Sequence, residues 1–494
     1  MESSLLGAPA AASTGPRHFV AHARAAVTIF GCTVSGGLVA IPKAYQTVGL
    51  APALIMSMIA GLTTGLSLVA LAMCSQRAGG ASTYGDVARK MTGPLLACGI
   101  DLLISLFLIG VLAGSFIVLR DWFVALTPRK EDAVVATIGV AAVGMLPLSL
   151  PRSIGFLAYS SFLSLAGFSL LVIVLVVYGL QSAISHAPPS DGILSFQSNV
   201  TNSSSSTVWW PDSFDPLALG LSFNVQMYSF ACQFQLMAIF QDLSSRLRES
   251  SPTASPVRAR FGAVVCGAVS GMIVLFGATG VFGVLAFPGK QLDGDVLKEL
   301  AYKPIGKVVR GCLTVGIGLS GPLMVHPTRE GFVRFGALVA QRLGWLSESR
   351  YETVSKRPPW IVHAAITAGI IAVSTTVALT FDKLMVLVGF LAAFLLIPLG
   401  LFFPAVALLI LPPPPSHDER TSVSPLVAAT VSDPPQVGST FGAGDAPSAL
   451  FGASTTRSTR RRGLHIWLLV MWMTIVTVVA LAVTIWHLTA DTRG

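Results

Sequence analysis

Polar and helix-breaking residues lie inside the first long apolar stretch of the chain, where their backbone groups could bind a solute. Ser35, Gly36 and Gly37 fall in the middle of this stretch, and Pro42 follows them. Glycine is a poor helix former and proline removes an internal hydrogen bond, so the pattern predicts an interrupted helix. In lipid, unpaired amides and carbonyls are tolerated only where they line a cavity or are buried in protein. The alternative is a kinked helix that packs through its glycines and binds no ligand.

The sixth apolar stretch is rich in polar side chains. Against lipid these would be costly, so we expect them to face protein or a wet cavity. They are Asn224, Gln226, Tyr228, Ser229, Cys232, Gln233 and Gln235. The eighth stretch carries several glycines and then Pro322, a pattern that predicts a locally weak helix there as well.

Few residues offer acid–base, nucleophilic or metal chemistry. Asp101, in the third stretch, is a candidate proton carrier because carboxylates inside a membrane are rare. Its position near the cytoplasmic edge also fits a solvated or snorkelling role. The chain has no HExxH, P-loop or GxSxG motif, and its six cysteines show no metal-ligand spacing. We therefore expect buried free thiols, no metal, no cofactor and no enzyme activity.

The composition of the chain places these residues in a membrane protein. Of 494 residues, 53% are hydrophobic and 11% are charged, with a mean hydropathy of +0.73, whereas soluble domains carry about 25% charged residues. The net charge of +9 does not indicate nucleic-acid binding, because the basic residues are scattered through loops. Apolar stretches of about the 20 residues that cross a bilayer occur at 25–46, 52–74, 95–119, 133–150, 154–181, 215–240, 260–287, 305–326, 360–380, 384–411 and 465–489.

The loops and tails predict the topology. Most of the 32 Lys and Arg residues fall on one side if the tail 1–24 is cytoplasmic, which agrees with the positive-inside rule. The 182–213 loop then lies outside, where its sequons at Asn199 and Asn202 are glycosylation candidates. Residues 25–411 would form a ten-helix core, 412–464 a disordered cytoplasmic linker, and 465–494 an eleventh helix with a short outer tail.

The two interrupted stretches, the first and the sixth, each open a set of five. This order predicts an inverted repeat of five plus five helices with a binding site near the membrane midplane. The residues alone thus indicate a secondary transporter and leave its substrate open.

Six motifs in the same order resemble those of the amino acid/auxin permease family, including its vesicular and sodium-coupled neutral amino acid transporter branches. The resemblance runs from about residue 25 to residue 411. The motifs are SGGLVAIPKAYQTVG (35–49), STYGDVARKMTG (82–93), LPLSLPRSIGFLAYSS (146–161), SFACQFQLMAIFQDL (229–243), LSGPLMVHPTR (319–329) and VGFLAAFLLIPLGLFFPA (388–405).

The resemblance implies an all-α polytopic membrane protein with a LeuT-like five-plus-five inverted repeat, an eleventh transmembrane helix and an amino acid as substrate. In such a fold the substrate carboxylate meets amides at a positive helix end, here those of Ser35, Gly36, Gly37 and Leu38. The substrate amine and side chain would meet the sixth stretch at Ser229, Phe230, Ala231, Cys232 and Gln233.

Departures from the family pattern bear on coupling. Gly31 and Ser320 stand where the sodium-coupled branch has Asn and Thr, so an amide oxygen is lost and a hydroxyl is kept. Sodium needs several oxygen ligands, and we therefore expect proton coupling or facilitated diffusion, with Ser320 and Asp101 as coupling candidates. Apart from Asp101, which is poorly placed, the stretches offer no carboxylate for a cationic substrate, and this favours neutral amino acids.

The sequence therefore predicts a symporter or uniporter of amino acids that works by alternating access. Its membrane would be the plasma membrane or that of an acidic, vacuole-like or lysosome-like organelle. The predicted partners are the amino acid, the lipid bilayer and protons. Two alternatives stay open: a sensor or scaffold of the same fold that does not transport, and a transporter of cationic amino acids.

Overall fold

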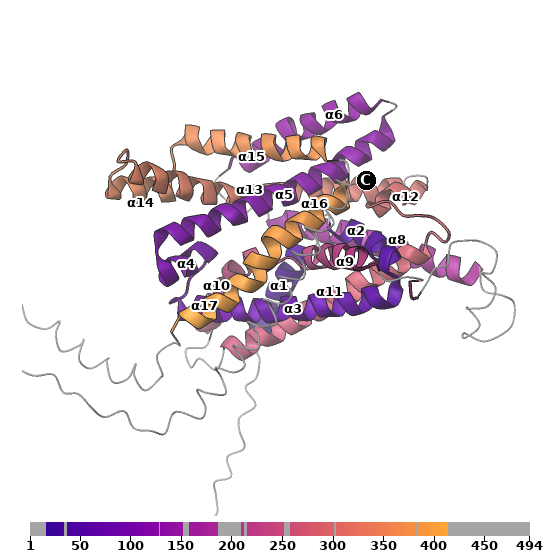
Figure 1. The fold of residues 1–494 in the computed structure, drawn as a ribbon, viewed down its shortest axis with the longest axis horizontal. Helices are drawn as coiled ribbons and strands as arrows, with labels where there is room; N and C mark the ends of the chain where they lie inside the picture. Colours follow the sequence, from indigo (N-terminus) through magenta and orange to yellow (C-terminus); the bar gives the residue numbers. More distant parts are fainter. Residues whose placement is uncertain are drawn as a thin grey trace, which may run out of the picture.

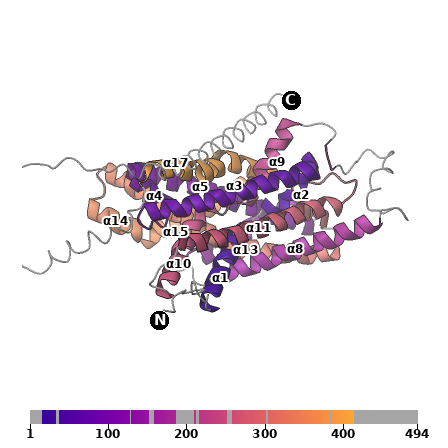
Figure 2. The same ribbon diagram turned by 90° about the horizontal axis from the view of Figure 1, so that it is seen from below.

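The regular structure is helical throughout the described residues of this computed structural model, which are 16–33, 37–127, 129–151, 158–185, 209–211, 215–250, 257–300, 303–381 and 383–412. Most helices run side by side along the long axis of the molecule (Figures 1 and 2). The short helices α4 (Tyr84–Thr92) and α14 (Glu348–Lys356) lie at one end, called here the α14 end. Helix α12 (Val296–Leu300) lies at the opposite end, the α12 end.

The longer helices fall into two groups along the chain, separated by the stretch between residues 185 and 215. The first group is α1 (Pro16–Thr33), α2 (Gly37–Val48), α3 (Leu50–Arg77), α5 (Pro94–Leu126), α6 (Lys130–Gly139) with the π-helical η1 (Val140–Met145) and α7 (Leu146–Ser149), and α8 (Ala158–Ser185). The second group is α9 (Pro216–Ser229), α10 (Gln233–Ser250), α11 (Val257–Leu285), α13 (Pro304–Arg342), α15 (Trp360–Thr380), and α16 (Leu384–Leu391) with the π-helical η3 (Ala392–Leu396) and η4 (Pro398–Phe402) and α17 (Phe403–Ile410).

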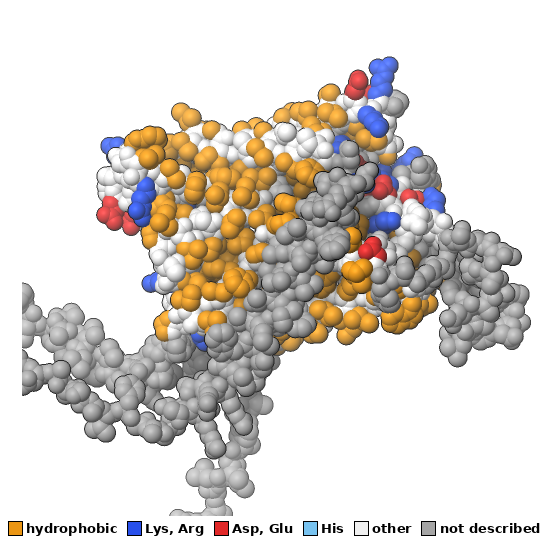
Figure 3. Space-filling view, in the orientation of Figure 1, with side chains coloured by type: hydrophobic (Ala, Val, Ile, Leu, Met, Phe, Trp, Pro, Cys, Tyr) orange, Lys and Arg blue, Asp and Glu red, His pale blue; other side chains and the backbone are white. Residues whose placement is uncertain are grey.

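The surface is that of a protein that crosses a membrane. Charged side chains gather at the two ends of the molecule, and hydrophobic side chains cover the face between them (Figure 3). Among the described residues, seven helices are long and apolar enough to cross a membrane. They are Leu50–Arg77, Pro94–Leu126, Lys130–Ser149, Leu165–Ser185, Phe261–Leu285, Trp360–Thr380 and Leu384–Ile410. The protein is therefore an all-α, polytopic integral membrane protein.

In helix α3, large apolar side chains face the lipid and small hydroxyl side chains face the protein interior. Its exposed large side chains, Ile55, Met58, Leu62 and Leu66, recur every three or four residues and form one lipid-facing stripe. The hydroxyl side chains of the same helix, Ser57, Thr63, Thr64 and Ser67, are at most 1% exposed. In lipid, small and polar residues belong at helix contacts, and α3 accordingly packs against α9, α10 and α11 with this face.

Helix α3 also supplies hydrogen-bond donors to the last described helix. Pro404 has no N–H, so the Gly400 carbonyl lacks its helical donor, and Ser67 Oγ donates to that carbonyl instead. Further along, Cys74 Sγ donates to the Pro404 carbonyl at 3.4 Å. The Arg77 guanidinium donates to the Leu408 carbonyl at 2.6 Å, near the end of α17. These contacts satisfy carbonyls that lipid could not.

Helix α13 contains the glycines and prolines of the eighth stretch. It runs unbroken from Pro304 to Arg342 with Pro322 and Pro327 inside it, so the local weakness predicted there does not interrupt the helix. Gly321 faces the Met145 side chain so closely that a Cβ atom there would overlap it. Its glycine therefore permits close helix packing and does not mark a break.

The cysteines are also only partly as expected. Cys74, Cys98 and Cys232 are buried free thiols, but Cys266 is exposed and Cys312 is partly exposed. The expectation of buried thiols is therefore wrong for Cys266, on α11. A thiol behaves as a small hydrophobe, so it can face the lipid at little cost.

Candidate functional site

The two segments predicted to be interrupted lie against each other. The sixth is interrupted, since α9 ends at Ser229 and α10 begins at Gln233. In the first, residues 34–36 lie outside the described residues, between α1 (Pro16–Thr33) and α2 (Gly37–Val48). A Cβ atom at Gly37 would lie 2.7 Å from Tyr228 Cδ1 and 2.8 Å from Ser229 Oγ. The start of α2 thus touches the end of α9, which brings Gly37 and Ser229 together although they are far apart in the sequence.

Next to this contact, a ring of buried hydrogen bonds that includes Ser57 of α3 holds α2 and α9 together. Tyr45 Oη donates to Ser57 Oγ at 2.6 Å, and Ser57 Oγ donates to Gln226 Oε1 at 2.6 Å. Gln226 Nε2 donates to Ser222 Oγ at 3.2 Å, and Ser222 Oγ donates to the carbonyl of Ala44, the residue before Tyr45. All four side chains are at most 1% exposed. The polar residues of the sixth stretch therefore face protein, as predicted.

Replacing Gln226 by leucine tests this ring. The substitution conserves size but leaves the buried Ser57 hydroxyl without an acceptor, which we expect to cost about 1–3 kcal/mol of stability. The measurement is thermal unfolding of the purified variant in detergent. The control is Thr376→Val, because Thr376 is exposed and bonds only to the Ala372 carbonyl of its own helix. Equal melting temperatures for the two variants would contradict the structural role of the ring.

The sixth interruption breaks the helical hydrogen-bond pattern over three residues. The N–H of Phe230 still bonds to the Gln226 carbonyl at 3.2 Å, but that of Ala231 bonds to the Tyr228 carbonyl at 3.0 Å, one residue nearer than in an α-helix. The Cys232 N–H bonds to Gln233 Oε1 at 3.0 Å. Since the last carbonyls of a helix have no intrahelical donor, the end of α9 presents carbonyl oxygens at the level of Gly37.

The side chains at this interruption have separate roles. Ser229 Oγ donates to the Val225 carbonyl at 2.9 Å, and the Phe230 ring packs edge-on against Phe276 in the core. Gln233 is fully buried, and its Nε2 has no hydrogen-bond partner. This segment can therefore bind a ligand mainly through its backbone groups and through the side chain of Cys232.

A cavity opens beside the interruption. It encloses about 370 Å³, counting the part that is open to solvent. The interruption contributes Ala231 and Cys232, and the rest of the lining consists of Phe107, Leu108, Val111, Tyr228, Phe234, Gln235 and Met324. Every lining residue is uncharged and most are apolar. Gln235 makes a weak contact to the Met324 sulfur at 3.9 Å, so its amide has little to hold it within the protein.

Most of the cavity wall could not be identified from the sequence. Phe107, Leu108 and Val111 are apolar residues in an apolar helix, and Met324 is likewise ordinary in its stretch. Tyr228, Cys232 and Gln235 did carry a signal, because they belong to the polar set of the sixth stretch, and Ala231 was predicted with Cys232 to bind the substrate.

The remaining candidate residues lie away from the cavity or outside the described residues. Asp101, on α5, is 8% exposed, and its carboxylate pairs with the Arg334 guanidinium of α13 at 3.4 Å. It is therefore buried and paired, and the solvated role considered for it is wrong. Ser320 lies within α13, but its side chain is outside the described part. Ser35, Gly36, Asn199 and Asn202 also lie outside the described residues, as do residues 413–494.

Comparisons with known proteins identify the family of the chain. The family described as "Transmembrane amino acid transporter protein" matches residues 21–429. "Vacuolar amino acid transporter 7" of Saccharomyces cerevisiae is 26% identical over 303 residues, which are 60% of this chain and 56% of that protein. "Sodium-coupled neutral amino acid transporter 7" of Mus musculus is 24% identical over 313 residues, or 60% of this chain and 61% of that protein. The chain thus spans less than two thirds of the length of these relatives.

Solved structures are also similar, with lower sequence identity. A nucleobase-cation-symport-1 family transporter in a closed conformation has a TM-score of 0.48 and 12% identity, with 94% of this chain and 91% of that chain covered. A manganese transporter of Eremococcus coleocola has a TM-score of 0.41 and 13% identity, with 97% of each chain covered. The family match over residues 21–429 decides the assignment: this chain belongs to the family of transmembrane amino acid transporter proteins.

Proposed function

We propose that this protein is a secondary transporter that moves neutral amino acids across a membrane by alternating access. The observation that carries the proposal is the contact of Gly37 with Ser229 beside an uncharged cavity. Two interrupted helices that meet at mid-membrane are what a transporter needs to bind a polar solute through backbone groups.

The helix ends at this contact have the polarity that a zwitterion requires. The start of α2 supplies the first-turn amides of Gly37 and Leu38 at a positive helix end, which suits a carboxylate. Ser35 and Gly36 extend the same segment in the sequence and belong to the proposed carboxylate site. The end of α9 supplies carbonyls from Ser229 onward, which suits an ammonium group.

The cavity supports neutral substrates. Its walls contain three aromatic rings and four aliphatic or thioether side chains, and no carboxylate or cationic group stands among them to pair with a charged substrate side chain. The names of the relatives, a vacuolar amino acid transporter and a sodium-coupled neutral amino acid transporter, support the same substrate class.

Coupling and topology complete the proposal. Transport is coupled to protons or uncoupled, with Ser320 and Asp101 as candidates for the coupling step. The core is arranged as a LeuT-like five-plus-five repeat, with an eleventh helix in 465–494. The α14 end is cytoplasmic, and Asn199 and Asn202 are on the opposite side, at the plasma membrane or the membrane of an acidic organelle.

Uptake into proteoliposomes tests the function. We expect labelled neutral amino acids to enter above the level of empty liposomes when choline replaces sodium, and unlabelled neutral amino acids to compete. Lysine should not compete, because the cavity walls hold no carboxylate. In parallel, a neutral amino acid at about 100 times its dissociation constant should add about 2.7 kcal/mol of stability in a thermal-shift assay.

Three outcomes would count against the proposal. Uptake of no amino acid, with or without a proton gradient, would remove transport as the function. Binding without flux would favour a sensor of the same fold. Preferred uptake of lysine would make the protein a cationic amino acid transporter.

A further inference from the structure

A strap of residues 288–300, which includes α12, leads from α11 towards α13 across the α12 end of the protein. Its apolar side chains are packed against the bundle: Leu292, Val296, Leu297 and Leu300 are at most 3% exposed. The strap is therefore docked on the helices beneath it.

The first half of the strap is attached to α2. Gln46 Nε2 donates to the Lys290 carbonyl at 2.5 Å, and Gln46 Oε1 accepts from the Leu292 N–H at 2.8 Å. Lys43 Nζ adds a bond to Gln291 Oε1 at 3.3 Å. Helix α2 begins at Gly37, so this half of the strap is tied to the helix that carries the proposed carboxylate site.

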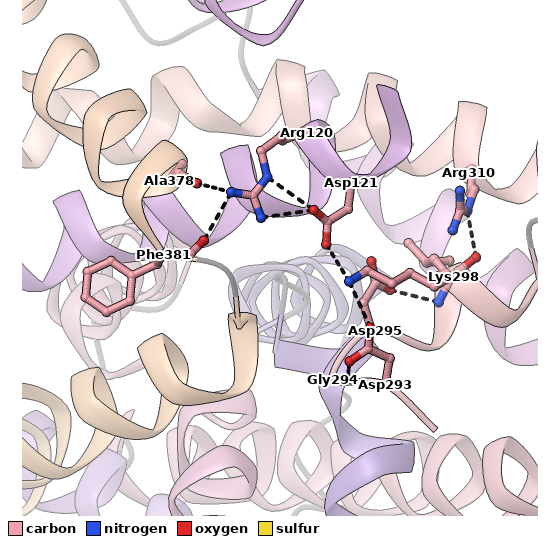
Figure 4. A network of polar contacts seen from close by, with 10 residues as sticks. Arg120, Asp121, Asp293, Gly294, Asp295, Lys298, Arg310, Ala378 and Phe381 are labelled. Carbon is pink, nitrogen blue, oxygen red and sulfur yellow. Dashed lines mark hydrogen bonds and ion pairs between the residues drawn. The ribbon is translucent and has the colours of Figure 1, made fainter. Parts of the chain in front are cut away.

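The second half is attached to α5 and, through it, to α15 (Figure 4). Lys298 Nζ lies 3.0 Å from Asp121 Oδ2 and 3.0 Å from Asp293 Oδ2. Asp121 is in turn held by Arg120 at 3.1 Å, and Arg120 donates to the Ala378 carbonyl near the end of α15 at 2.8 Å. The strap thus bridges α2 on one side and α5 with α15 on the other.

A carboxyl group is buried at the centre of this bridge. Asp295 is 3% exposed, and its Oδ1 accepts from the Leu297 N–H at 2.8 Å. Burial raises the pKa of Asp295 to about 7; the Asp121 carboxylate adds to the rise, while the Leu297 bond, Arg310 and Lys298 oppose it. Besides Asp295, the strap carries the charged groups Lys290, Asp293, Lys298 and Glu299, and the neighbouring helices bring Lys43, Asp121 and Arg310 to it, with Arg120 bound to Asp121.

We propose that Asp295 is a proton-binding group whose protonation keeps the strap docked between α2 and α5 and so closes the α12 end of the protein. An ionised Asp295 in the docked strap would be a buried negative charge beside the Asp121 carboxylate, whereas a neutral carboxyl keeps its bond to Leu297 without that cost. The inference goes beyond the transport function, since strap docking is a property of the protein without substrate.

The direction of the pH effect follows from the raised pKa. The docked strap binds the proton of Asp295 more tightly than an undocked strap, in which the solvated side chain has its ordinary value of 3.8. Docking is therefore fully favoured below about pH 4, weakens about tenfold per pH unit from there to about pH 7, and is constant above. Acid on the α12 side therefore strengthens the closure of this end, and neutral pH weakens it.

Hydrogen–deuterium exchange of the purified full-length protein measures strap docking directly. After correction for the intrinsic pH dependence of exchange, opening of the strap peptide should rise about tenfold per pH unit between about pH 5 and about pH 6.5 in the unmodified chain. In Asp295→Asn, which is neutral at every pH, the strap should stay protected across the whole range. The matched control is Glu299→Gln, which removes a carboxylate of the same strap, paired with Lys290, and should keep the pH response.

A flat exchange profile in the unmodified chain, or a pH response that persists in Asp295→Asn, would overturn the inference. A melting temperature for each variant shows that it is folded. The result does not depend on transport: a protein that shows the strap response but takes up no amino acid would refute the proposed function and leave the proton-binding role of Asp295 standing.

Discussion

Replacing Gly37 by valine is expected to abolish amino acid uptake while leaving membrane insertion intact. Any Cβ atom at this position would lie 2.7 Å from the Tyr228 ring and 2.8 Å from Ser229 Oγ, so the start of α2 must move away from the end of α9. A displacement of about 1 Å at a binding site costs about 100-fold in activity, and the two γ-methyl groups of valine enlarge it. The measurement is uptake of a labelled neutral amino acid into proteoliposomes at matched protein content.

The matched control for this variant is Gly99→Val on α5. A Cβ atom at Gly99 meets no other atom within 4 Å, so the same change of residue adds bulk without a clash. We expect this control to keep uptake near the unmodified level, and Gly37→Ala to fall between the two. Normal uptake by Gly37→Val would show that the contact of α2 with α9 is not the substrate site.

Replacing Asp101 by alanine should destabilise the protein by about 3 kcal/mol, because it leaves the largely buried Arg334 guanidinium without its partner. The Arg334 side chain stays partly exposed to solvent and lies 3.8 Å from Glu330. The expected loss of stability is therefore at the low end of the range for broken buried ion pairs. The expected readout is a lower melting temperature of the purified variant.

Two further variants separate the pair from a general effect of charge. The double variant Asp101→Ala with Arg334→Met should recover most of the loss, because no unpaired charge remains. Asp86→Ala, which removes a carboxylate whose bond to Ser82 is exposed, should change stability by about 0–1 kcal/mol. A double variant no more stable than Asp101→Ala would mean that Asp101 acts through something other than Arg334.

The interruption of the sixth helix could be predicted because it rests on local chemistry. The polar set around Ser229 is a poor choice for a helix in lipid, and α9 ends at Ser229. The interruption of the first helix stays a prediction, because residues 34–36 lie outside the described residues. In α13 a similar pattern does not interrupt the helix, because glycine there serves close packing: Gly321 lies against Met145, and the helix continues past Pro322. Glycine in an apolar stretch can thus either interrupt a helix or allow close helix packing, and only the residues that contact it in the structure distinguish the two roles.

The sequence also could not predict which charged side chains are buried. Asp295 reads as one of several charged residues in a polar loop, and only the packing of the strap makes it a buried carboxyl. Asp101 reads as a residue at the membrane edge, but α13 covers it and supplies Arg334. The cavity wall is hidden for a related reason, because Phe107 and Met324 have the same character as the lipid-facing residues of their helices.

The ring of hydrogen bonds through Tyr45, Ser57, Gln226 and Ser222 begins and ends on neighbouring residues of α2. The Ser57 and Ser222 hydroxyls each accept one bond and donate another, and the Tyr45 hydroxyl donates one, so opening any of these bonds leaves a buried donor without an acceptor. The ring therefore opposes separation of α2 from α9, and it includes α3 through Ser57. Helices α1 and α10 pack against each other on the other side of the interruptions. We therefore expect the half of the candidate site towards the α12 end to be more rigid than the half towards the α14 end.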